Sequence, residues 1–164
     1  MASANGQGFN IGTDANVAVS DNYGDSFPID ALGHMMDFDS EAAASIVKIT
    51  PITRGGIPLF QTVWNGGSGR ITFARVNGNL QAMILELMDA YHSAGIIPLF
   101  TLTLSILNRD NSIDEYLYSG VQWDATHLGN FRALKEVDMS LPFMWAQCVK
   151  TGGAPPFLTG LAAA

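Results

Sequence analysis

Hydrophobic and polar residues alternate along much of the chain with the period of two that is typical of β-strands. In the stretch HMMDFDSE, the carboxylates of Asp37, Asp39 and Glu41 lie on one face, and Met36 and Phe38 lie on the other. This pattern predicts a half-buried strand with a row of acidic side chains on its outer face.

The following segments are rich in β-branched and aromatic residues. SIVKITPI (45–52) continues the strand pattern, and the sequence NGGSG (65–69) separates IPLFQTVW (57–64) from RITFARV (70–76). Glycines between two such runs favour a hairpin with a glycine loop or a bulge. Because NGGSGR lacks the GK[ST] ending of a phosphate-binding loop, a hairpin tip is the better interpretation of this motif.

Residues 79–94 have the helical period instead. Six apolar side chains fall within one arc and predict a helix that lies with one side on a sheet: Leu80, Met83, Ile84, Leu87, Met88 and Tyr91. Asn79 is the expected N-cap, and Gly95 occupies the position where a left-handed C-terminal residue is favoured. Leu85 lies outside the arc, where it is exposed and able to contact a neighbouring subunit.

Strand patterns return after Pro98. FTLTLSIL (100–107) and EYLYSGVQW (115–123) flank the turn residues NRDN, which predicts a second hairpin. In residues 131–145 the odd positions are apolar apart from Lys135, which predicts a long closing strand. Such a buried Lys needs a carboxylate partner or a bend in the strand.

The chain length of 164 residues suits one domain. Residues 1–33 are rich in Gly, Asn, Asp and Ser, which predicts an extended arm and loops, and residues 34–150 are the expected core. Residues 151–164 contain two prolines and many small residues, and we expect them to form an extension that docks on another subunit.

The composition points to self-assembly. Hydrophobic residues make up 48% of the chain and charged residues only 14%, whereas about a quarter of the residues of a typical soluble domain are charged. No apolar run reaches the eighteen or so residues of a spanning helix, so no membrane partner is expected. Contacts with other copies of the chain are the better explanation for the missing surface charge.

The net charge of −7 argues against a surface that binds nucleic acid, because such a surface concentrates Lys and Arg. The N-terminus lacks the basic start and apolar block of a secretory signal, so folding in the cytoplasm is expected. Cys148 is the single cysteine of the chain, and we interpret it as a buried small hydrophobic residue.

Two groups of residues are candidates for chemistry. Glu86, Asp89 and His92 are spaced by three on the predicted helix, but successive steps turn by about 60°, so the outer two diverge and a solvated or interfacial face is favoured over a metal site. Asp124 and His127 could form an acid–imidazole pair. No nucleophile stands in a recognisable turn beside them, and Asp is common in turns, so a loop is the simpler interpretation.

The acidic row of Asp37, Asp39 and Glu41 is informative because three carboxylates on one strand face repel one another unless the face meets water or cations. A Ca²⁺ ion is bound by ligands that wrap around it from a loop, and a straight row does not provide them. The row therefore predicts a hydrated, negatively charged wall.

The order of these elements resembles the tail tube proteins of contractile-tailed bacteriophages. The resemblance covers about 57–148 and consists of VWNGGSGRITFARVNG, one amphipathic helix, a hairpin with a polar turn, YLYSGVQW, a loop and a long closing strand. It implies a mainly β fold, a barrel or sandwich of two packed antiparallel sheets with one flanking α-helix at about 79–94, an N-terminal arm and a C-terminal tail.

The resemblance also implies a function. Six copies would form a ring, and stacked rings would form the inner tube of the virion tail, through which DNA and the tape measure protein pass without specific binding. Sheath, baseplate and tail terminator proteins would be the partners, with assembly in the host cytoplasm. No cofactor, metal or catalysis is expected.

Under this resemblance the acidic side chains acquire a role. A negative wall repels phosphates, so DNA slides past it. The expected lumen-facing acids are Asp37, Asp39, Glu41, Glu136 and Asp138. The expected subunit contacts are Leu85, Glu86, Asp89, Arg132 and Leu134.

Three alternatives remain open on the sequence. The chain could be the tube of a type VI secretion or other contractile injection system, or a baseplate or terminator ring protein of the same fold. From another class, it could be a β-barrel that binds a small ligand or an enzyme that uses Asp124 and His127.

Overall fold

The computed structural model describes residues 15–51, 55–124 and 138–153. The described elements are β1 (Ala15–Asp21), β2 (Ser26–Pro28), the 3₁₀ turn η2 (Ile29–Ala31), β3 (His34–Ile49), β4 (Leu59–Ala74), α1 (Asn79–Ala94), β5 (Phe100–Leu107), β6 (Ile113–Trp123), β7 (Asp138–Trp145) and β8 (Gln147–Gly152). The fold is mainly β with one helix, as the sequence predicts. Every strand pair is antiparallel.

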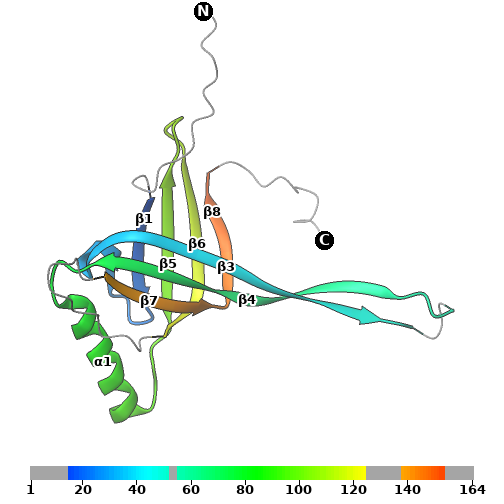
Figure 1. The fold of residues 1–164 in the computed structure, drawn as a ribbon, viewed down its shortest axis with the longest axis horizontal. Coiled ribbons are helices and arrows are strands. Elements are labelled where there is room, and N and C mark those ends of the chain that lie inside the picture. Colours follow the sequence, from blue (N-terminus) through cyan, green and yellow to red (C-terminus); the bar gives the residue numbers. More distant parts are fainter. Residues whose placement is uncertain (1–14, 52–54, 125–137, 154–164) are drawn as a thin grey trace, which may run out of the picture.

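The strands form two layers that cross each other (Figure 1). One layer has the order β2-β1-β5-β6-β8, and the other contains β7, β4 and β3. Strand β6 belongs to both layers, because Glu115 to Ser119 pair with β8 while Gln122 and Trp123 pair with β7. The two layers are thus one sheet folded over on itself, which is how a small sandwich is closed at a corner.

Gly120 is the corner residue of β6. Its φ of 65° lies in the left-handed region, and a Cβ atom there would be 2.9 Å from the Cβ of Ala146. Ala146 separates β7 from β8, and its backbone N–H donates to the Ser119 carbonyl at 3.0 Å. The predicted closing strand therefore changes layers at Ala146, because the missing side chain of Gly120 lets the two chain segments meet.

The core lies between the two layers. The fully buried side chains come from both of them and from the helix: Val17, Val19, Ile29, Ile71, Phe73, Leu80, Ile84, Leu102, Val121, Met139, Leu141 and Phe143. Among the described residues no polar or charged residue is buried. The apolar odd positions predicted for the closing strand are confirmed for Met139, Leu141 and Phe143, and residues 131–137 lie outside the described part of the chain.

The prediction of an arm and loops over residues 1–33 is wrong from Ala15 onward. Strand β1 pairs along its whole length with β5, and Val17 and Val19 are completely buried. The composition indicated loops because only alternate residues of this strand face the core, and polar residues occupy the positions between them. At the other end, Thr151 and Gly152 belong to β8, so the predicted extension over 151–164 begins too early.

The predicted hairpin tip at NGGSG is also wrong, whereas the predicted bulge is confirmed. Strand β4 continues through residues 65–69 without a turn, and its pairing with β3 shifts between Ala42 and Ala44. Gly66 has a φ of 76° at this bulge. A second shift, between Met35 and Asp37, leaves Met36 exposed rather than on the core face.

The helix has the predicted bounds. Gly95 ends it with a φ of 69°, and its backbone N–H donates a hydrogen bond of 2.8 Å to the Tyr91 carbonyl. Asn79 is not the N-cap. Gly78 holds that position, and the Asn79 side chain instead donates to the Ala31 carbonyl at 2.9 Å, which attaches the start of the helix to η2.

We predict that Gly120→Ala lowers the free energy of unfolding by about 1–3 kcal/mol more than Gly95→Ala. Both substitutions place a side chain at a similar positive φ, but the space beside Gly95 is open, whereas Gly120 meets Ala146. Urea unfolding of the unassembled chain measures the difference. Equal losses for the two variants would contradict the assigned corner contact.

Candidate functional site

A long two-stranded arm extends from the sandwich (Figure 1). It consists of the outer half of β3, Ala42–Ile49, paired with the first part of β4, Leu59–Trp64. Within these two stretches the arm pairs with no other described strand. An isolated two-stranded ribbon is marginally stable in water at best, so this arm depends on additional contacts.

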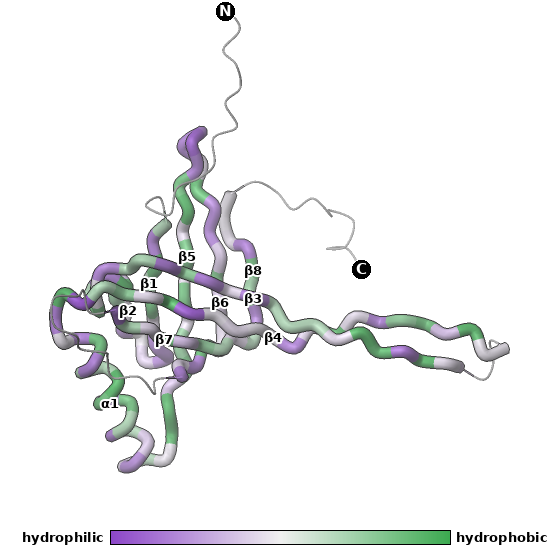
Figure 2. The backbone as a smooth tube through the Cα atoms, in the orientation of Figure 1, coloured by the Kyte–Doolittle hydropathy of each residue, from purple (hydrophilic) through white to green (hydrophobic). Residues whose placement is uncertain are grey.

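Both faces of the arm carry apolar side chains, and Figure 2 colours much of the arm green for hydrophobic residues. Directly paired residues of antiparallel strands share a face. The pairs Ala44 with Trp64, Ile46 with Thr62 and Lys48 with Phe60 define one face, here called the aromatic face. The pairs Ser45 with Val63, Val47 with Gln61 and Ile49 with Leu59 define the other face, here called the aliphatic face.

The exposed fractions of these side chains are high. Trp64 is 70% exposed, Ile46 71% and Phe60 68% on the aromatic face, while the four apolar residues of the aliphatic face are 38–47% exposed. Lys48 is the one charged residue in the described part of the arm. Monomeric soluble proteins rarely expose contiguous apolar surface of this kind, and such surface marks an interaction site.

The arm begins at a strip of glycines on β4. Gly67 and Gly69 lie opposite Trp145 and Phe143 of β7, and a Cβ atom on either glycine would overlap the facing ring. The rings therefore lie flat across β4 where side chains would otherwise stand. The NGGSG sequence serves this close approach and the bulge, and it does not form a loop.

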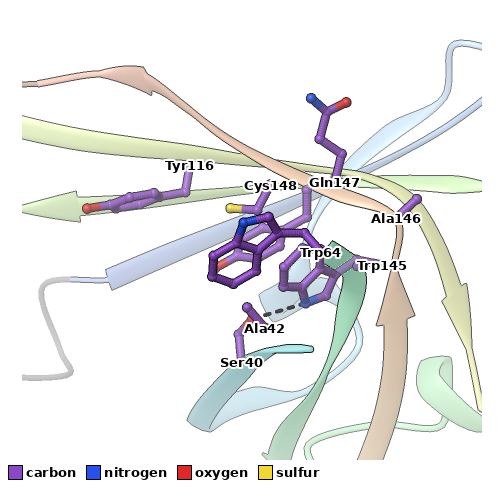
Figure 3. Close-up of a pocket in the computed structure, with 10 residues that line it drawn as sticks. Ser40, Ala42, Trp64, Tyr116, Trp145, Ala146, Gln147 and Cys148 are labelled. Atoms are coloured by element: carbon purple, nitrogen blue, oxygen red, sulfur yellow. Dashed lines mark hydrogen bonds between the residues drawn. The ribbon is translucent and has the colours of Figure 1, made fainter. Parts of the chain in front are cut away.

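An aromatic groove lies at the root of the arm (Figure 3). It has a volume of about 470 Å³, and its lining comes from β3, β4, β6, β7 and β8. The groove is lined by Ser40, Ala42, Trp64, Gly66, Tyr116, Tyr118, Trp145, Ala146, Gln147 and Cys148. The rings of Tyr118 and Trp145 meet edge to face with centroids 5.5 Å apart.

The polar atoms of the groove floor bond to one another. The indole N–H of Trp145 donates to the Ser40 hydroxyl at 3.2 Å. Burial raises the pKa of the Tyr118 hydroxyl, against an opposing hydrogen bond with Ser40. Burial likewise raises the pKa of the Cys148 thiol. Cys148 is partly buried rather than fully buried, so its sequence interpretation holds only in part.

The structure brings the predicted acidic row together on the outer face of the β3-β4-β7 layer. Asp37, Asp39 and Glu41 are exposed, and their pairing partners on β4 are Thr72, Arg70 and Ser68. Asp138 is exposed at the start of β7, beside the same layer. Glu136 lies outside the described residues.

A shallow hollow of about 440 Å³ lies beside these acids, lined in part by Asp39, Glu41, Arg70 and Asp124. Within the described ranges, no group of three or more His, Cys, Asp or Glu residues is placed to hold a metal ion. The acidic row is thus an exposed charged face, as its spacing predicts.

The candidate residues on the helix do not lie at one common site. Leu85 is 54% exposed, and Glu86, Asp89 and His92 are exposed. Glu86 lines a hollow beside η2, whereas His92 lines a different one beside Trp123. Met88 and Tyr91, which the sequence places on the buried side, are 47% and 54% exposed, so the helix is buried in the core only as far as Leu87. Arg132, Leu134, Lys135 and His127 lie outside the described residues.

Sequence analysis missed both the arm and the groove. A signal for the arm was present, because Ile46, Val47 and Ile49 place apolar side chains on both faces of one strand. The groove left no comparable signal, since its residues come from distant parts of the chain. No helix in the described ranges is long and apolar enough to cross a membrane.

No protein-family model matches the sequence, and no curated protein is similar to it. Solved structures, in contrast, share its fold. The tube-terminating cap of the anti-feeding prophage aligns with a TM-score of 0.59 and 9% identity, covering 90% of this chain and 93% of that one. A chain of the PVC extracellular contractile injection system sheath-tube complex aligns with a TM-score of 0.58 and 11% identity, covering 90% and 94%.

The SPP1 tail tube protein aligns with a TM-score of 0.53 and 14% identity, covering 93% of this chain and 85% of that one. The chain therefore has the fold of tube, cap and baseplate proteins of contractile injection systems and phage tails. This fold is the one that the sequence resemblance implies.

We predict that Gly67→Ala destabilises the sandwich by about 1–3 kcal/mol, because its methyl group would overlap the Trp145 ring and the Glu41 carbonyl. Ser68→Ala is the matched control, since Ser68 is the next residue of the same strand and is exposed. Urea unfolding provides the measurement. A Gly67→Ala variant as stable as Ser68→Ala would contradict the flat packing of Trp145 on β4.

Proposed function

We propose that the chain is a structural subunit of a phage tail tube, that it forms rings of six copies, and that the rings stack into a conduit for DNA. The observation that carries this proposal is the arm, whose two apolar faces need cover from other molecules. The shared fold supports the class of assembly. The protein has no catalytic role, and its partners are the sheath, baseplate and terminator proteins of the same tail.

The energetics favour a repeated contact over a single dimer. Burying one large apolar side chain is worth about 1.5–3 kcal/mol, and roughly half of that for a side chain that is already half covered. The seven large apolar residues of the arm thus contribute on the order of 10 kcal/mol. Association costs about 4–15 kcal/mol, so one arm contact gives weak binding. In a closed ring the arm of every subunit packs on a neighbouring subunit, so the ring is more stable than a dimer held by one arm contact.

The acidic outer face of the β3-β4-β7 layer is the proposed lumen wall. Asp37, Asp39, Glu41 and Asp138 lie on or beside one layer with the base Arg70 among them. Such a face repels the phosphate backbone and offers DNA no fixed site. We assign the exposed helix residues Leu85, Glu86 and Asp89 to contacts with a neighbouring subunit.

Electron microscopy of the purified chain tests the proposal. We expect stacked rings that form tubes, and we expect Ile46→Lys to abolish them, because a charged side chain on the aromatic face opposes its burial. Val76→Lys is the matched control, since Val76 is also 71% exposed but lies outside the arm. Tubes from Ile46→Lys that equal those of the wild type would refute the role of the arm, and single rings would indicate a cap or baseplate protein.

A charge variant tests the lumen wall. Replacing Asp37, Asp39 and Glu41 by Asn, Asn and Gln is expected to leave tube formation intact and to increase the amount of DNA retained by tubes at low salt. The control replaces Glu86 and Asp89 by Gln and Asn, which lie on the helix. Co-sedimentation with short DNA gives the measurement, and equal retention by both variants would contradict the assignment.

A further inference from the structure

The aromatic groove at the root of the arm is bounded by two edge strands. In the described part of the chain β3 pairs only with β4, and β8 pairs only with β6. The groove lies where these two edges approach each other, so the sandwich is open along this side. Exposed edges of this kind are normally covered in assembled proteins.

The chemistry of the groove selects an apolar occupant. The hydroxyl of Ser40 already accepts from the Trp145 indole and bonds with the Tyr118 hydroxyl. Figure 3 shows the indoles of Trp64 and Trp145 next to each other, with Cys148 beside them. The groove therefore presents mainly aromatic rings and a thiol. Its volume of about 470 Å³ is enough for two or three large side chains.

The aromatic face of the arm has the matching chemistry but, beyond its root, does not reach the groove of its own chain. Trp64 at the root already lines that groove. Phe60 is four residues farther along the strand, which places it about 13 Å beyond Trp64. Phe60 and Ile46 are thus left 68% and 71% exposed by the described part of the chain.

We propose that the aromatic face of one arm, with Ile46 and Phe60, packs into the aromatic groove of a second copy against Tyr118, Trp145 and Cys148. This inference rests on the proposed function, and it adds the identity of the receiving surface. The aliphatic face, with Val47, Ile49 and Leu59, then remains for a third copy, because one groove covers only one face of a ribbon.

Charge favours a second copy as the occupant. All carboxylates of the described residues lie outside the arm, and the one charge on the described arm is the cationic Lys48. The chain as a whole carries −7. The net negative charge of a second copy attracts Lys48 of the arm, whereas contact between two bodies opposes like charges. The groove is also continuous with the arm through Trp64, so each added copy extends one apolar surface.

Cysteine cross-linking tests this contact, because Cys148 is the single cysteine of the chain. A disulfide forms only when the two Cα atoms lie within about 7 Å of each other. We expect Phe60→Cys tubes oxidised with diamide to give a ladder of covalent oligomers on a non-reducing gel. Phe60 is 68% exposed, so the substitution does not disturb the core.

Two controls make the result specific. Gln61→Cys places the thiol one residue along the strand from Phe60 but on the aliphatic face, and we expect no ladder from it. Adding Cys148→Ser to Phe60→Cys is expected to remove the ladder. If the wild type and Phe60→Cys both form tubes but Phe60→Cys gives no ladder, the groove assignment is overturned while the proposed function stands. A wild-type chain that forms no rings would overturn the proposed function itself.

Labelling of Cys148 with a maleimide separates a second copy from other occupants. We expect the thiol to react at least tenfold faster in the unassembled Ile46→Lys variant than in wild-type tubes. Equal protection in both would show that a small ligand or another segment of the same chain fills the groove, and it would overturn the proposal.

Discussion

The packing of Trp145 and Phe143 across the glycines of β4 is the contact on which the rest of the structure depends. The two rings lie over β4 because no side chain at Gly67 or Gly69 occupies that space. The same rings join Phe38 of β3 and Tyr118 of β6 in one aromatic cluster, with centroid distances of 5.5–6.5 Å. Core and groove are therefore one packed unit, and the arm continues from it.

The arm and the groove at its root give this chain, which carries few charged residues, two apolar surfaces of different shape. Seven of the twenty exposed large hydrophobic residues of the described chain lie on the projecting ribbon, and the carboxylates of Asp37, Asp39 and Glu41 lie on a separate face. A ribbon and a groove are different surfaces, so the proposed contact between copies is head to tail. Repeated contacts of that type close into rings or continue as filaments, and both outcomes occur in a stacked tube.

Local patterns predicted much of the fold. The helix at 79–94, the end of that helix at Gly95, the second hairpin and the acidic row all follow from periodicities of one segment. The errors arose where distant segments meet. Strand β1 looks polar until its pairing with β5 is known, and NGGSG resembles a loop until Trp145 is placed across it. The groove combines residues 40–66 with residues 116–148, which no local pattern connects.

The most direct test of the account is a helical reconstruction of the assembled wild-type chain by electron cryo-microscopy. The account predicts that both faces of every arm are covered by two different copies, with Phe60 in the groove beside Trp145 and with Asp39 facing the lumen. Arms that project into solvent, or subunits that associate while their arms and grooves stay uncovered, would contradict it.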